Sequence, residues 1–142
     1  MPCEVRLKIE SRADIIAARE RGRALALQAG FSFCDSTLIT TAISEITRNI
    51  LEHATRGELI LSLLENGSGK GVKIIASDRG PGIEDIPRVM QDGFSTCLGL
   101  GIGLPGTRRL MDEFEISSSL GNGTTVTMEK WTRSNGGRES QN

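Results

Sequence analysis

The sequence is poor in several residue types, and each shortage excludes a class of protein. Its 142 residues include no tyrosine, one tryptophan, one histidine and three cysteines. An odd number of cysteines with no C-x-x-C pair argues against a disulfide scaffold. A single histidine and no paired cysteines leave too few ligands for a zinc site. We therefore expect a protein of a reducing compartment, the cytoplasm.

Net charge and long apolar runs are also scarce. The formal net charge is −1, so no overall electrostatic field draws the chain to nucleic acid or to anionic lipid. No apolar run approaches the ~20 residues of a membrane-spanning helix, and the N-terminal residues lack the pattern of a secretory signal. We predict neither a nucleic-acid partner nor a membrane.

Glycine, by contrast, is abundant and clustered. Of the 17 glycines, many lie in residues 78–106, which read D-R-G-P-G-I-E-D-I-P-R-V-M-Q-D-G-F-S-T-C-L-G-L-G-I-G-L-P-G. Glycine suits positions where the backbone approaches a ligand closely or takes a positive φ. Two glycine clusters on either side of a loop predict a phosphate-binding segment with a lid.

The N-terminal pattern predicts an edge strand followed by a helix. Residues 3–9 alternate between apolar and charged side chains, which is typical of a strand with one buried face. A helix is expected over residues 12–29, with Ser11 and Asp14 as a capping box and Gly30 as its end. The apolar positions expected to face the core are Ile15, Ile16, Ala18, Leu25 and Leu27.

A second, longer helix is expected over about residues 35–54, with Asp35 or Ser36 as its N-cap. Its apolar residues recur every 3.6 positions, at Leu38, Ile39, Ala42, Ile43, Ile46, Ile50 and Ala54. Strands are then expected over 58–65 and 72–77 and over 114–119 and 124–131, each pair joined by a hairpin turn. Between the pairs we expect a short helix at 87–90 and a helix over 102–113. This order predicts one α+β domain over residues 1–131, a two-layer sandwich with helices on one face, and a disordered tail over 132–142.

Three polar residues of the second helix lie one turn apart. Glu45, Asn49 and His53 form a row along the edge of the apolar stripe, so we expect them to be half-buried. A half-buried carboxylate needs a partner or a proton-transfer role, and an amide oxygen can bind a hard cation. On this helix alone, ordinary polar residues at a helix edge remain the alternative.

Polar chemistry is also expected where the strand over 72–77 ends. Period-two alternation places Asp78 on the apolar face of that strand, where its carboxylate could accept a hydrogen bond from an amine such as adenine N6. A D-x-G turn that merely ends a strand is the alternative. The second glycine cluster precedes a helix, whose free N–H groups suit phosphates, although a flexible loop would fit as well. The G-x-G-x-x-G at 101–106 lacks the preceding strand of a dinucleotide site.

Together, E-x-x-x-N on a helix, D-x-G-x-G, G-x-G-x-G and G-T in the last strand resemble the motifs of the GHKL ATP-binding superfamily. The resemblance spans residues 3–131 and implies the Bergerat fold, a two-layer α/β sandwich with a mixed, mainly antiparallel sheet. It implies that Glu45 is the general base, that Asn49 binds Mg²⁺ and that residues 83–98 form a short ATP lid. The residues that it implies for ATP binding are Asn49, Asp78, Gly80, Gly82, Ile83, Gly99, Leu100, Gly101, Ile102, Gly103, Leu104 and Thr124.

Within this superfamily, residues 98–114 and 123–131 are similar to the small bacterial serine kinases of partner-switching modules. That similarity implies phosphorylation of a serine on a STAS-domain antagonist protein and contact with a STAS-containing stressosome scaffold. It also implies binding and activation of a PP2C-type phosphatase after release. An anti-sigma factor that binds a sigma factor is the alternative, and a non-kinase ATPase is a third possibility. The motifs do not separate these functions, nor a monomer from a dimer.

Positive charge is absent from most of the expected lid. No Lys or Arg lies between Arg88 and Arg108, so this part of the lid brings no cation to the phosphates. Arg108 and Arg109 lie one turn into the following helix, where surface charge is the simpler interpretation. Arg19, Glu20, Arg21 and Arg23 mark a candidate partner surface on the first helix, with a solvated charged face as the alternative.

Overall fold

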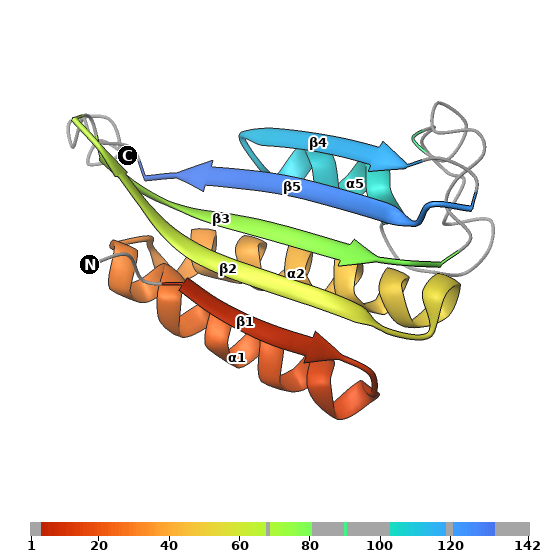
Figure 1. Ribbon diagram of the computed structural model, residues 1–142. Helices are drawn as coiled ribbons and strands as arrows, with labels where there is room; N and C mark the ends of the chain where they lie inside the picture. Colours follow the sequence, from red (N-terminus) through yellow and green to blue (C-terminus); the bar gives the residue numbers. More distant parts are fainter. Residues whose placement is uncertain (1–3, 68, 81–89, 91–102, 119–120, 133–142) are drawn as a thin grey trace.

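The computed structural model in Figure 1 describes residues 4–67, 69–80, 90, 103–118 and 121–132. Its elements in chain order are β1 (Glu4–Ile9), α1 (Arg12–Ala29), α2 (Phe33–Ala54), β2 (Gly57–Asn66), β3 (Gly69–Asp78), α5 (Gly103–Leu110), β4 (Glu113–Ser118) and β5 (Thr124–Trp131). The predicted order of helices and strands is confirmed for this part of the chain. The predicted helix at 87–90 and the tail after residue 132 lie outside it, apart from residue 90.

The five strands form one sheet in the order β1-β2-β3-β5-β4. All four neighbouring pairs are antiparallel, so the described strands form an antiparallel sheet and the mixed sheet of the prediction is wrong for them. The helices lie on one face of this sheet (Figure 1). The two-layer α+β sandwich is therefore confirmed, and β1 lies at the sheet edge as expected.

The core lies between α2 and the inner face of the sheet. The predicted stripe of α2 is buried at five of its seven positions, namely Ile39, Ala42, Ile43, Ile46 and Ile50, and Leu38 and Ala54 are half-buried. Two buried threonines on the same helix bond back to its own carbonyls, Thr40 to Ser36 at 2.7 Å and Thr47 to Ile43 at 2.7 Å. These bonds allow hydroxyl groups to be buried without losing a partner.

The inward face of α1 differs from the prediction at two positions. Ile16 is 55% exposed and Leu27 is 51% exposed, so the expectation that both face the core is wrong. The buried positions of α1 are Ala18, Gly22, Leu25, Ala26 and Ala29, and a side chain at Gly22 would overlap Ile43 of α2. The two helices approach so closely at Gly22 that a side chain there has no room, and Leu25 is the one large apolar residue among the buried positions of α1.

The helix ends follow local capping groups. The Asp14 carboxylate accepts hydrogen bonds from the N–H groups of Glu10 and Ser11, and Gly30 ends α1 with φ 98°. Ser32 caps α2, accepting from Asp35 N–H at 3.0 Å, so the predicted cap at Asp35 or Ser36 is wrong by about one turn. The helix expected over 102–113 ends at residue 110 instead, and β4 begins at residue 113.

Among the described helices, none is both long enough and apolar enough to cross a membrane.

Candidate functional site

Three residues, Gly57, Asp78 and Thr124, are aligned in one row across the sheet at the C-terminal end of β3. Asp78 lies opposite Gly57 on β2 and opposite Thr124 on β5. Their neighbours two positions along each strand, Leu59, Ala76 and Val126, are buried against the helices. The row therefore lies on the helix-facing side, and Asp78 is the polar end of an apolar row, as predicted.

The D-x-G turn brings this row into contact with α2. The Asp78 Oδ1 atom accepts a hydrogen bond from Gly80 N–H at 2.9 Å. A Cβ atom at Gly80 would lie 2.6 Å from Ala54 Cβ and 3.1 Å from the His53 carbonyl oxygen. Only glycine lets the turn close this tightly onto the last turn of α2. The D-x-G turn therefore contacts the C-terminal end of the helix that carries Glu45 and Asn49.

The G-T pair of β5 approaches the same turn from the other side. Gly123 has φ 81°, and a Cβ atom there would overlap the Asp78 carbonyl oxygen and lie 2.9 Å from Arg79 Cα. Thr124 follows it and is 9% exposed. The G-T motif thus contacts the D-x-G-x-G motif, and the requirement for glycine at residue 123 comes from both the positive φ and the close approach.

One residue of this corner was missed in the sequence. The Ser118 hydroxyl donates to the Gly123 carbonyl oxygen at 2.9 Å and lies 2.8 Å from the Thr124 hydroxyl. Since its single proton is used on Gly123, Thr124 is the donor in the second bond. Ser118 therefore fixes the orientation of the Thr124 hydroxyl. The last position of β4 gave no sequence signal for this contact, because the contact depends on how the β4–β5 hairpin closes.

The polar row on α2 is partly as predicted. Glu45 and Asn49 are half-buried, whereas His53 is exposed. The Glu45 side chain is 12% exposed, and its Oε2 atom accepts a hydrogen bond from Arg48 Nη1 at 3.1 Å. The half-buried carboxylate therefore has a charged partner on its own helix, a contact that no sequence motif predicted.

Asn49 is the described residue that the resemblance assigns to a magnesium ion. The described part of the chain contains no group of three or more His, Cys, Asp or Glu side chains that could hold a metal ion by themselves. Mg²⁺ is typically bound by one or two protein oxygens, several waters and substrate phosphates. The half-buried amide of Asn49, one turn from Glu45, can supply one such oxygen.

The start of α5 is the described end of the glycine-rich stretch. Gly103 begins α5, which packs against α2, so the positive end of its dipole lies in the layer that holds Glu45 and Asn49. Leu104 is 8% exposed and belongs to the core, so only its backbone could contact a phosphate. The remaining predicted nucleotide residues lie outside the described ranges, namely Gly82, Ile83, Gly99, Leu100, Gly101 and Ile102.

Both arginines of α5 are exposed. Arg109 donates from Nη1 to the carbonyl oxygen of Pro105 on its own helix, at 3.3 Å. This arrangement agrees with the interpretation of Arg108 and Arg109 as surface charge.

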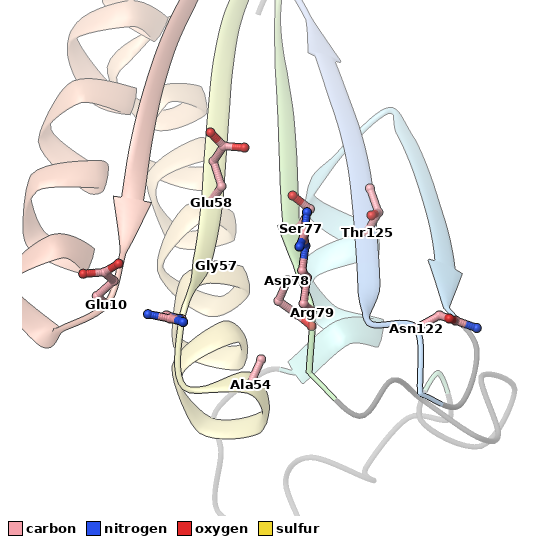
Figure 2. Close-up of a pocket in the computed structure, with 10 residues that line it drawn as sticks. Glu10, Ala54, Gly57, Glu58, Ser77, Asp78, Arg79, Asn122 and Thr125 are labelled. Atoms are coloured by element: carbon pink, nitrogen blue, oxygen red, sulfur yellow. The ribbon is translucent and has the colours of Figure 1, made fainter.

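A cavity of about 610 Å³ opens beside Asp78 at this end of the sheet (Figure 2). It reaches Ala54 and Asp78, but other parts of its wall come from Glu58, Ser77 and Thr125. Strand alternation places these three residues on the face of the sheet opposite to Asp78. The cavity is therefore centred on the helix-free side, and it is not the space expected between α2 and the glycine-rich stretch.

Comparison with known proteins gives three consistent results. The family described as histidine kinase-, DNA gyrase B-, and HSP90-like ATPase matches residues 34–134. The serine/threonine-protein kinase RsbT of Bacillus subtilis (strain 168) is 50% identical over 127 residues, which cover 89% of this chain and 96% of RsbT. The anti-sigma F factor of Thermoanaerobacter sp. (strain X514) is 37% identical over 97 residues, covering 66% of this chain and 68% of the factor.

A solved structure supports the same fold. The RsbU and RsbW domains of a Mycobacterium tuberculosis protein match with a TM-score of 0.63 and 24% identity. The match covers 94% of this chain and 32% of that longer chain. At this level of identity, the likeness shows the shared fold.

Proposed function

This chain belongs to the family of histidine kinase-, DNA gyrase B- and HSP90-like ATPases, and on that premise we propose that it is an ATP-dependent protein serine/threonine kinase. The observation that carries the proposal is the meeting of separate motifs at one corner of the sandwich. Gly80 lies against the end of α2, Gly123 lies against the Asp78 carbonyl oxygen, and the Gly80 N–H donates to the Asp78 side chain. A carboxylate at the mouth of an apolar core, flanked by close-packed glycines, suits a flat base with an exocyclic amine.

The proposed nucleotide site uses each motif for one part of ATP. Asp78 accepts a hydrogen bond from the adenine amine, and Thr124, oriented by Ser118, completes that end of the site. The phosphates lie toward the start of α5, where free N–H groups and the helix dipole favour anions. Asn49 holds Mg²⁺, which when bound neutralises negative charge on the transferred phosphoryl group.

The proposed reaction transfers the terminal phosphoryl group of ATP to a serine hydroxyl of a partner protein. Glu45 removes the hydroxyl proton as the serine oxygen bonds to the γ-phosphorus, and the bond from that phosphorus to the bridging oxygen breaks, releasing ADP. General base catalysis of this kind typically contributes 10²–10⁴-fold. The half-buried position of Glu45 supports this role, because water does not surround the carboxylate on all sides.

The proposed acceptor is a STAS-domain antagonist protein. A STAS-containing stressosome scaffold and a PP2C-type phosphatase, which the released kinase activates, are the further partners of the proposed switch. Support comes from the 50% identity to a protein named serine/threonine-protein kinase RsbT over almost its whole length. The second candidate function is that of an anti-sigma factor, which the 37% identity to an anti-sigma F factor favours.

Phosphosite mapping tests the proposed function. The chain is mixed with Mg-ATP and a STAS-domain protein encoded beside it, and the product is examined by mass spectrometry. We expect one phosphoserine on the STAS domain, absent when that serine is replaced by alanine. ATP-dependent capture of a sigma factor without phosphorylation of the STAS domain would favour the anti-sigma function. Steady ATP hydrolysis without any protein acceptor would favour a non-kinase ATPase.

A further inference from the structure

Arg48 has an unusual position relative to the proposed catalytic residues. It lies one residue before Asn49 and one helical turn after Glu45, and its guanidinium contacts Glu45 Oε2 at 3.1 Å. The Arg48 side chain is 42% exposed, whereas that of Glu45 is 12% exposed. The pair therefore links a solvent-facing cation to a carboxylate at the edge of the core. This ion pair differs from those of Arg6 with Glu4 and Glu58, whose side chains are all more than 40% exposed.

The burial of Glu45 makes this contact important. Two exposed side chains gain little from an ion pair, because water screens the attraction and freezing long side chains costs entropy. A carboxylate that has lost most of its water depends more on the hydrogen bonds that remain. The i,i+3 spacing on a regular helix lets Arg48 reach back along the helix surface to Glu45. It thereby limits the rotamers available to the Glu45 side chain.

We propose that Arg48 is a positioning residue that holds the Glu45 carboxylate in the orientation needed to accept the proton of the substrate serine. This inference rests on the proposed kinase function and extends it to Arg48, which occupies an unspecified position of the E-x-x-x-N motif. The Arg48 contact uses Oε2, which is one of the two carboxylate oxygens. A base must lie within hydrogen-bonding distance of the proton that it removes, so a change in its rotamer lowers the rate without changing the affinity for nucleotide.

Single-turnover kinetics of phosphoryl transfer test this role. With saturating Mg-ATP and the STAS-domain acceptor, we expect Arg48→Ala to lower the transfer rate about 10- to 100-fold, which is the loss typical of a misplaced catalytic group. Arg48→Lys keeps the charge but not the planar guanidinium, so we expect it to recover part of the rate. The affinity for a fluorescent ATP analogue and the thermal unfolding temperature should remain those of the wild type. Arg12→Ala is the matched control, since Arg12 is exposed at the start of α1.

A double-mutant cycle shows whether Arg48 acts through Glu45. In the Glu45→Gln background, we expect Arg48→Ala to cause less than a twofold further loss. An equal further loss in that background would overturn the inference, because Arg48 would then act on another group. A wild-type rate in both Arg48 variants would also overturn it while leaving the kinase function intact. Absence of transfer by the wild-type chain would instead overturn the proposed function, and this inference with it. If Arg48→Ala does not fold, Arg48→Lys and Arg48→Gln serve for the same cycle.

Discussion

Two glycines of one hairpin turn offer a direct test of how the candidate site is built. Gly121 and Gly123 have nearly the same positive φ, 82° and 81°. They differ in their surroundings, because a Cβ atom at Gly121 would have no atom within 4 Å, whereas one at Gly123 would overlap the Asp78 carbonyl oxygen. Replacing each by alanine therefore separates the cost of the backbone conformation from the cost of the close approach.

The two substitutions should differ in magnitude. The left-handed conformation costs an alanine roughly 1–2 kcal/mol, and both variants share this term. Forcing an extra methyl group into a packed region typically costs a further ~1–3 kcal/mol, and only Gly123→Ala has this term. At roughly 2–4 °C per kcal/mol for a chain somewhat longer than this one, Gly123→Ala should unfold about 2–12 °C below Gly121→Ala.

Thermal unfolding with and without ATP is the assay. To relieve the overlap, β5 must move away from Asp78, so Gly123→Ala should also bind ATP more weakly than Gly121→Ala. If the two variants have the same unfolding temperature and the same ATP affinity, the close approach of β5 to the D-x-G turn is refuted. In that case only the positive φ requires glycine at these positions.

Three further substitutions test other parts of the site. Asp78→Asn presents an amide in place of the carboxylate, so we expect roughly 10- to 100-fold weaker ATP binding in an equilibrium titration, and unchanged affinity would exclude the adenine contact. Ser118→Ala removes the partner of Gly123 and Thr124, and calorimetry should show a loss of about 1–2 kcal/mol; a neutral effect would show that Ser118 does not hold this corner. Thr55 ends α2 with φ 73°, which is a strained conformation for a β-branched residue. Thr55→Gly should therefore raise the unfolding temperature by a few degrees, and a lower unfolding temperature would show that Thr55 is not strained.

Much of the fold followed from the sequence because periodicity reports which face of an element is buried. The alternation in β1 and the 3.6-residue stripe of α2 depend on burial alone, and both are confirmed. The errors on α1 have a physical cause. Where α1 meets α2 at Gly22, four of the five buried residues of α1 are glycine or alanine, and the large residues Ile16 and Leu27 lie on the outside. Hydrophobic periodicity cannot identify such a contact.

The site was predictable to the extent that its residues are fixed by backbone geometry. The D-x-G turn and the glycine of the last hairpin were identified as turns from the local sequence, and the resemblance to the GHKL superfamily implied their place in one nucleotide site. The contacts of Arg48 and Ser118 were not found, because each depends on the direction of one side chain after folding. The start of α2 was missed for a different reason. Phe33 and Cys34 are exposed, so no apolar stripe marks the first turn after Ser32.

Phosphoryl transfer to a serine with Glu45 as the base is tested most directly by single-turnover phosphorylation of a STAS-domain protein, with the wild-type chain and with Glu45→Gln. We expect the wild type to form phosphoserine and Glu45→Gln to form it at a rate about 10²–10⁴-fold lower, with its ATP affinity retained. Transfer by Glu45→Gln at the wild-type rate, or the absence of any phosphoserine with the wild type, would contradict this mechanism.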